Sequence, residues 1–279
     1  MRAGTLLALA LIAPSIGAAQ DMRSFTVDRG RRSESSLHTI IDLAAGTFFL
    51  RPSTTDALYR MDLKYDADRY TPVAAFESDR SQVRLGLEKR KSGGLWVVKR
   101  DQLAQSAVVE LSPDVALTLE ANLGASETSL ELGGLRLEDL SLVTGASRTE
   151  VRFSRVNPTL CRRAVVTTGA AEFVVKGLGN SGCRRWDIGG GVGAVRLELD
   201  GAWNAPARVQ LDMTLGGVTL AVPSSLGVRI RLNRFLATFS PDRFTRDGNV
   251  YTSDNYATAK RTVDFDISTT LGEVRVEWR

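Results

Sequence analysis

Two consecutive stretches of sequence, "CRRAVVTTGAAEFVVKGLGNSG" (161–182) and "CRRWDIGGGVGAVRLELDG" (183–201), decide the fold. Each begins with Cys-Arg-Arg, alternates apolar and polar residues, reaches a glycine and then alternates again. Alternation with a period of two is typical of a strand with one buried face. Each stretch therefore predicts two short strands that share one core.

The pattern recurs along the chain, for example in "LGASETSLEL", "TGASRTEVRF", "TLGGVTLAV" and "TLGEVRVEW". Each copy can be aligned on one anchor position. Apolar residues lie five and three residues before this anchor, and again four, six and eight residues after it. The anchors follow at steps of 21, 24, 22, 23 and 56 residues: Gly124, Gly145, Gly169, Gly191, Thr214 and Thr270. The last step predicts an insertion between two copies.

Two earlier copies are expected at longer intervals. "HTIIDLAAGTFFL" places Thr39, Ile41, Phe48 and Leu50 on matching offsets. "VAAFESDRSQVRLGL" does the same with four further residues: Ala74, Phe76, Val83 and Leu85.

The repeats predict an all-β fold, because helical periodicity is scarce and Gly or Pro turns separate the alternating segments. A unit of about 22 residues cannot bury its own apolar face, so each must stack on the next, strand on parallel strand. We therefore expect a single-chain parallel β-solenoid with rungs of about 22 residues. A β-sandwich is the alternative, although it does not require a fixed spacing.

The segment "GLGNSG", Gly177 to Gly182, matches the Gly-x-Gly-x-x-Gly pattern of dinucleotide-binding enzymes. That chemistry needs a helix after the last glycine, whose N-terminus receives the pyrophosphate. The glycine-rich stretch that follows is a poor helix former. We interpret "GLGNSG" as a tight corner between rungs, and no cofactor is expected.

Cys161 and Cys183 each lie eight residues before an anchor, in consecutive rungs. Stacked strands lie about 4.8 Å apart, which is within reach of a disulfide, so we expect these two residues to be bonded. Reduced, buried thiols are the alternative. A metal site is not expected, because two cysteines and the distant His38 do not form a ligand set.

The repeated Cys-Arg-Arg also predicts a basic ladder on one outer edge: Arg162, Arg163, Arg184, Arg185 and Arg208. Arginine binds phosphates and carboxylates bidentately, so the ladder could bind an anionic envelope polymer or an acidic protein partner. The alternative is that Asp139, Asp187 and Asp264 on neighbouring outward positions neutralise it.

No catalytic residue is expected. His38 is the only histidine, and it is more simply a surface or capping side chain. Asp264 and Asp266 would share an outer strand face, as in β-solenoids that cleave acidic polysaccharides, but any half-buried strand produces this spacing. The pair at Asp66 and Asp68 is no more specific. No interleaving of basic and aromatic residues suggests a nucleic-acid partner.

The ends of the chain predict its location and domain organisation. Residues 1–19, "MRAGTLLALALIAPSIGAA", have the charge, short apolar run and small residues of a cleaved signal peptide, and no later run is long enough to span a bilayer. We expect a periplasmic or secreted protein with a linker at 20–36 and one domain at 37–279.

An insertion or cap is expected at 223–261. Its aromatic residues would cover the open end, with ligand contact by Tyr251 and Tyr256 as the alternative.

Several phrases of the sequence resemble the toast-rack family of exported β-repeat domains. They are the Gly-Ala-Ser and Gly-Ala-Ala turns, "YDADRYTPVAAFESDRSQVRLGLEK", "SPDVALTLEANLGA" and "DGNVYTSDNYATAKRTVDFDIS". The family includes the C-terminal domain of cell-wall-active antibiotic response proteins. The resemblance spans 37–279 and implies a non-enzymatic module that in some members senses or regulates. The chain lacks the transmembrane helices of those proteins, and the usual Gly-Ala-Gly turn is altered.

The function expected from the sequence is a non-enzymatic binding, sensing or regulatory protein of the cell envelope. Its partner would be an envelope protein or an anionic polymer. An adhesive or structural protein that assembles through an uncapped rung edge is the first alternative, and a polysaccharide-active enzyme is the second.

Overall fold

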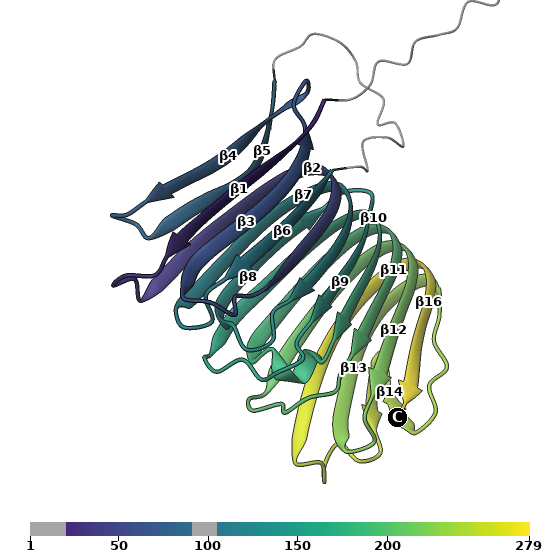
Figure 1. Cartoon of the computed structure of the whole chain (residues 1–279). Helices are drawn as coiled ribbons and strands as arrows, with labels where there is room; N and C mark the ends of the chain where they lie inside the picture. The colour runs from purple at the N-terminus through teal and green to yellow at the C-terminus, as the bar shows by residue number, and fades with distance from the viewer. Residues whose placement is uncertain (1–20, 91–104) are drawn as a thin grey trace, which may run out of the picture.

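The computed structural model describes residues 21–90 and 105–279, which form one sheet of sixteen strands (Figure 1). The fold is all-β, as predicted. Within the described residues, no helix is long and apolar enough to cross a membrane. The strands are β1 (Met22–Gly30), β2 (Ser36–Pro52), β3 (Ala57–Asp66), β4 (Tyr70–Glu77), β5 (Gln82–Lys89), β6 (Ser106–Leu111), β7 (Ala116–Glu131), β8 (Arg136–Thr144), β9 (Ser147–Arg152), β10 (Cys161–Lys176), β11 (Cys183–Glu198), β12 (Ala207–Val222), β13 (Leu226–Thr238), β14 (Phe244–Asp247), β15 (Val250–Ser253) and β16 (Arg261–Trp278).

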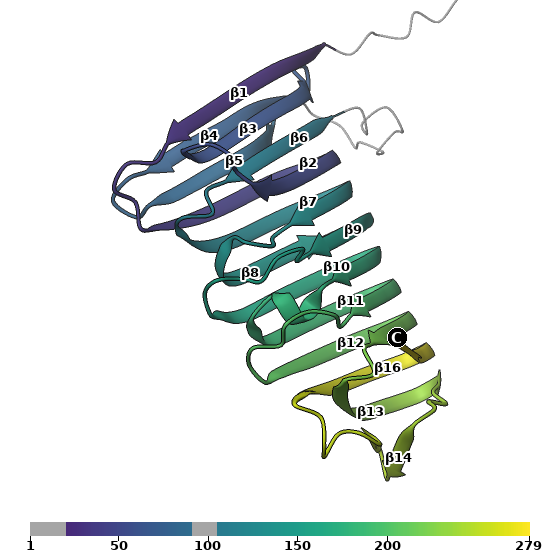
Figure 2. The ribbon, with the colours of Figure 1, turned by 60° about the horizontal axis from the view of Figure 1, so that its bottom comes forward.

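The main row of the sheet is parallel. Along the order β2-β7-β8-β10-β11-β12-β16-β13 every adjacent pair is parallel, and the strands lie side by side in one direction (Figure 2). The register places Ala164 beside Trp186, Trp186 beside Val209, and Val209 beside Phe265. These are equivalent residues of the aligned repeats, so the alignment from β7 to β16 is in register.

Each long strand bends once, which gives it two limbs. The sequence predicted two separate strands per repeat, but β10, β11, β12 and β16 each run through the bend, and only β8 and β9 are separate. We call the half before the bend the first limb, the half after it the second limb, and the bend the crest. Gly193 and Gly216, with φ of 145° and 143°, adopt at the crest a backbone conformation that other residues rarely reach.

The core lies between the two limbs. Apolar residues from both limbs are buried there in successive rungs, among them Phe173 of β10 and Trp186 of β11. Phe153, at the base below β9, meets Trp186 edge to face with ring centroids 6.1 Å apart. At the base, "GLGNSG" forms the corner between β10 and β11, with a short 3-10 turn η2 (Leu178–Asn180) between left-handed Gly177 and Gly182. The predicted corner is confirmed.

The N-terminal part differs from the sequence prediction. Residues 20–36 were expected to be a linker, but β1 pairs antiparallel with β3. Residues 74–85 were expected to form a parallel rung, but β4 and β5 form an antiparallel hairpin that pairs Ala74 with Leu85. Alternation is the same in both arrangements, and only the short turn at 78–81 distinguishes them. The predicted signal peptide at 1–19 lies outside the described residues.

The insertion at 223–261 adds one strand and a hairpin. β16 pairs with β12, as the 56-residue step predicted, and β13 pairs with the other side of β16. β15 and β14 follow as a hairpin along part of β13. Phe239 and Tyr251 are buried at this end with ring centroids 4.7 Å apart, whereas Phe235 and Leu236 are exposed. Only some of the aromatic residues therefore cover the end of the core.

Candidate functional site

The predicted disulfide is present. Cys161 and Cys183 are opposite each other in the parallel register of β10 and β11, with Cα atoms 4.1 Å apart, and their sulfur atoms are bonded. The bond ties two successive rungs together at the base of the first limb.

The arginines of the basic ladder lie on the outer face of the first limb, where most of them are paired with carboxylates. Their ion-pair partners are Asp139 and Glu138 for Arg162, Asp187 for both Arg163 (2.5 Å) and Arg185 (2.7 Å), and Asp266 for Arg208 (3.9 Å). Arg184 is exposed, and no partner is found for its side chain in the described part of the chain. The ladder is thus largely neutralised.

The other groups considered from the sequence also have partners. Asp264 accepts two hydrogen bonds from Arg229 and one from the hydroxyl of Tyr256, and Asp266 is paired with Arg231 at 3.0 Å. His38 lies 2.9 Å from Glu120. These contacts make the two aspartates parts of a charged outer face and not an unpaired acid-base couple.

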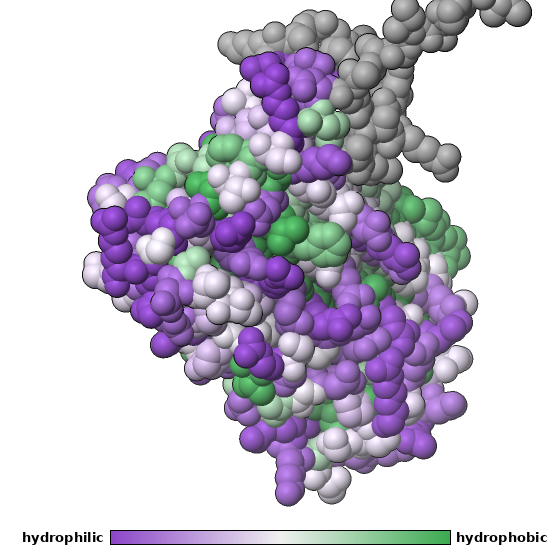
Figure 3. All heavy atoms as spheres, viewed as in Figure 1, coloured by the Kyte–Doolittle hydropathy of each residue, from purple (hydrophilic) through white to green (hydrophobic). Residues whose placement is uncertain are grey.

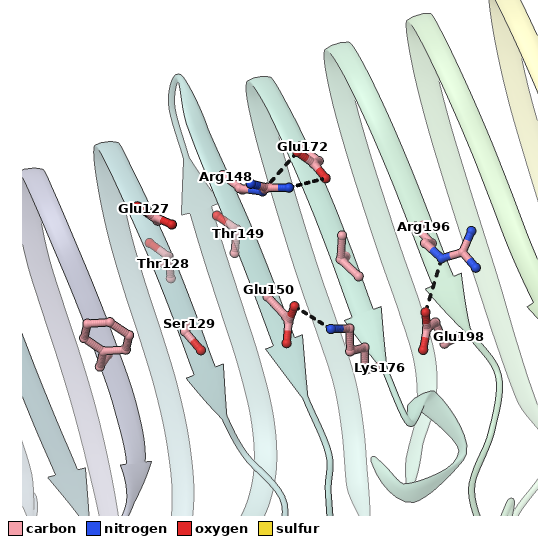
Figure 4. Close-up of a pocket in the computed structure, with 12 residues that line it drawn as sticks. Glu127, Thr128, Ser129, Arg148, Thr149, Glu150, Glu172, Lys176, Arg196 and Glu198 are labelled. Atoms are coloured by element: carbon pink, nitrogen blue, oxygen red, sulfur yellow. Dashed lines mark hydrogen bonds and ion pairs between the residues drawn. The ribbon is translucent and has the colours of Figure 1, made fainter.

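A hollow on the outer face lies along the second limb and was not predicted. It is a groove of about 510 Å³ across β2, β7, β9, β10 and β11. Phe49 comes from β2, the first strand of the groove, and Val174 comes from β10. Charged side chains of β7, β9, β10 and β11 make up most of the remaining lining (Figure 4). Because the register is parallel, equivalent outward residues of neighbouring strands lie side by side. Each row of side chains therefore consists of equivalent positions of successive repeats.

Ion pairs neutralise the β9 to β11 end of the groove. Arg148 lies 3.1 Å from Glu172, and Lys176 lies 2.7 Å from Glu150. Burial raises the pKa of Glu150, but hydrogen bonds from Arg152 and Lys176 outweigh burial and hold the pKa below its ordinary value. The charges at this end of the groove are therefore paired with one another.

Glu198 closes this end of the groove. Burial raises the pKa of Glu198, but hydrogen bonds from Arg279 and Arg196 outweigh burial and leave the pKa below its ordinary value. Arg196 also bonds Glu277, which joins β11 to the last long strand. Glu198 thus pairs as a carboxylate with two arginines, Arg196 and Arg279.

The opposite end of the groove is open and unpaired. Phe49 is 46% exposed, although it lies on a strand of the sheet. Glu127 and Ser129 on β7 line the groove beside it, and no cation or hydrogen-bond partner is found for either side chain among residues 21–90 and 105–279. An aromatic face next to a free carboxylate can bind a cationic group together with an apolar one.

Sequence reasoning missed the groove because its residues look like the solvated half of an alternating strand. The one available signal was Phe49, which takes an outward position between the inward Phe48 and Leu50.

Comparison with protein families identifies the fold family. The model of the N-terminal domain of toast_rack, DUF2154, matches residues 17–176, more than half of the chain. The chain belongs to the toast-rack family. The matched part of this toast-rack chain includes β1 to β10 and all of the groove except its β11 end.

Solved structures of bacterial proteins have a similar shape. One is a protein of Clostridium sporogenes that is provisionally described as a cell adhesion protein. The similarity covers 92% of the toast-rack chain and 100% of the Clostridium chain, with 14% sequence identity and a TM-score of 0.45. A provisionally described adhesin of Bacteroides fragilis covers 91% and 97%, with 12% identity and a TM-score of 0.40. We draw no function from either likeness. No curated protein is significantly similar to the chain.

Proposed function

We propose that this toast-rack protein is exported and acts at the cell envelope as a non-enzymatic binding module. The disulfide between Cys161 and Cys183 supports export, because such bonds persist in oxidising compartments, and residues 1–19 have the pattern of a signal peptide. Periplasmic or secreted residence follows from the same proposal.

We further propose that each rung is one turn of a single-chain parallel β-solenoid. Segment 177–182 supports this path, because it connects the second limb of β10 to the first limb of β11 at the base. Parallel stacking then repeats outward side chains as columns, which gives the protein extended outer faces for binding.

The observation that carries the binding proposal is the open end of the groove, where Phe49, Glu127 and Ser129 have no partner within the part of the chain that the structure describes. This end suits an envelope protein that presents a lysine or arginine beside an apolar side chain. An anionic polymer on the basic ladder is less favoured, because Arg162, Arg163, Arg185 and Arg208 already pair with carboxylates.

The test uses the oxidised wild-type protein and two variants of it to capture a partner from envelope extract. The affinity of each protein for the purified partner is then measured. One variant carries Phe49→Ala and Glu127→Gln, and the other changes Arg163, Arg185 and Arg208 to Ala. We expect the groove variant to lose at least about tenfold in affinity with an unchanged melting temperature, and the arginine variant to bind as before. Loss in the arginine variant alone would place binding on the basic ladder.

A further inference from the structure

A row of exposed apolar side chains runs along the crest at the C-terminal end of the sheet. Val192, Leu215, Leu271 and Leu236 are direct neighbours in the register of β11, β12, β16 and β13. Their exposed fractions are 50%, 43%, 40% and 65%, and adjacent Phe235 is 79% exposed. We call these five residues the apolar crest.

The fold does not require large apolar residues at this position. The equivalent residue of β10 is Ala170, which pairs with Val192, and the two preceding rungs have Ala146 and Ala125 there. The side chains enlarge from alanine to valine and leucine only toward the C-terminal end. Packing therefore does not explain them, and exposed apolar patches of this kind mark contact with proteins or membranes.

The shape of the apolar crest favours a lipid surface over a protein. The crest is the convex side of each bent strand, and hydrophobic groups reach the surface beside the bends of β10 and β11 (Figures 1 and 3). The row is one residue wide on β11, β12 and β16 and two residues wide on β13. Stable protein interfaces are broader and bury roughly 1,200 Å² or more of total surface.

The strand edge at the end of the apolar crest is partly closed. β15 pairs with Arg229 to Arg231 on the outer side of β13, and beyond them Arg234 folds back so that its Nη1 donates to the carbonyl of Ala237 at 3.0 Å. A strand from a second copy would have to displace this guanidinium, whereas side-chain insertion into lipid would leave it in place.

Polar groups lie at the level expected of lipid headgroups. A shallow hollow of about 470 Å³ beside the apolar crest is lined by Asp212, Thr214, Ser268, Asn233 and Arg234, among others. Arg234 has no acidic partner among the described residues. Segment 223–261 contains seven Lys or Arg and three Asp, a formal charge of +4, and the ion pairs of Arg229 with Asp264 and of Arg231 with Asp266 lower it to +2. This remaining positive charge is attracted to anionic lipid headgroups.

We propose that the apolar crest rests on a bilayer, with its side chains between the headgroups and Arg234 beside the lipid phosphates. This contact is independent of the groove on the second limb. It makes the protein peripheral to a membrane, oriented with its C-terminal crest on the lipid.

The test is flotation of the chain from Asp21 onward, which contains the whole described sheet, with vesicles of phosphatidylcholine with and without phosphatidylglycerol. We expect binding that increases with phosphatidylglycerol, and a loss of at least about tenfold in the Phe235→Ser, Leu236→Ser variant. The matched control Leu160→Ser removes a residue that is 45% exposed and lies outside both the apolar crest and the groove, and it should float like the wild type. Circular dichroism and melting temperature check the folding of each variant.

A gain-of-function variant keeps the proposal testable if the serine variant unfolds. Ala170→Leu extends the row by one rung and should strengthen vesicle binding several-fold. Failure of the wild type to float, equal loss in Leu160→Ser, or no gain in Ala170→Leu would overturn the proposal. Concentration-dependent dimers that dissociate in the serine variant, without vesicle binding, would assign the apolar crest to self-association instead.

Discussion

At the scale of single residues, the glycines of the crest set how closely the rungs stack. A Cβ atom on Gly216 would lie 1.7 Å from the carbonyl oxygen of Gly193 in the neighbouring rung, and the φ of Gly216 is 143°. We expect Gly216→Ala to lower the free energy of unfolding by about 3 kcal/mol or more, because it adds backbone strain to a steric clash that cannot relax. Urea denaturation measures the change.

The adjacent Gly217 provides the control for Gly216→Ala. A Cβ there meets nothing within 4 Å, so Gly217→Ala should change stability by less than about 1 kcal/mol. Equal effects of the two substitutions would show that the crest is loose enough to accept side chains at either position.

Glu198 provides a prediction about pH. Its side chain is 15% exposed, and its pKa is lower in the folded protein than the ordinary 4.5. A lowered folded-state pKa means that the stabilisation is complete above pH 4.5 and is lost as the pH falls through the folded-state value. Glu198→Gln should therefore cost about 1 kcal/mol at neutral pH and make the acid loss of stability less steep.

The pH dependence of Glu198→Gln is measured by urea denaturation at a series of pH values. Glu172→Gln is the control, because that carboxylate is 48% exposed and, among the described residues, pairs only with Arg148. If the curves of the wild type and Glu198→Gln run parallel into acid, the ion pairs of Glu198 do not contribute to stability.

At the scale of elements, the disulfide joins β10 to β11 across 22 residues of sequence. Replacing both cysteines with alanine should lower the free energy of unfolding by about 3 kcal/mol, since the unfolded chain gains freedom when the loop opens. Denaturation with and without reductant checks this, because reductant should bring the wild type to the stability of the double variant and leave the variant unchanged. A reductant effect on the variant would point to another cause.

The elements also show how far sequence reasoning reaches. Repeat spacing predicted the register of β7 to β16, because a slip of one residue would turn Val195 and Leu197 out of the core. It did not predict the hairpin of β4 and β5, because alternation carries no information on strand direction. It also missed the continuity of each rung through the crest, where a glycine permits a bend without ending the strand.

The candidate surfaces were only partly predictable, for a related reason. The positions of the basic ladder followed from the repeat, and its neutralisation followed from Asp139 and Asp187 on neighbouring outward positions. The groove and the apolar crest depend on side chains that face solvent, where periodicity predicts polarity and nothing more. Phe49 and Phe235 break that expectation, but a single exposed aromatic residue is common on protein surfaces.

At the scale of the whole molecule, stability should vary along the row of strands, because each rung contacts only its neighbours. The C-terminal end depends on its cap, in which Phe239 packs against Tyr251 and Phe244 with ring centroids 4.7 Å and 6.5 Å apart. Phe239→Ala should destabilise this end by about 3 kcal/mol. Hydrogen exchange should then accelerate in β13 and β16, while β7 and β10 keep the protection of the wild type.

Phe235→Ala is the matched comparison for Phe239→Ala, since the same residue type four positions earlier is 79% exposed and supports no core contact. It should leave hydrogen exchange unchanged in every strand. If Phe239→Ala instead accelerates exchange uniformly from β2 to β16, the sheet opens as a single cooperative unit. The cap would then stabilise the whole protein, and the repeats would not act as a chain of separable neighbours.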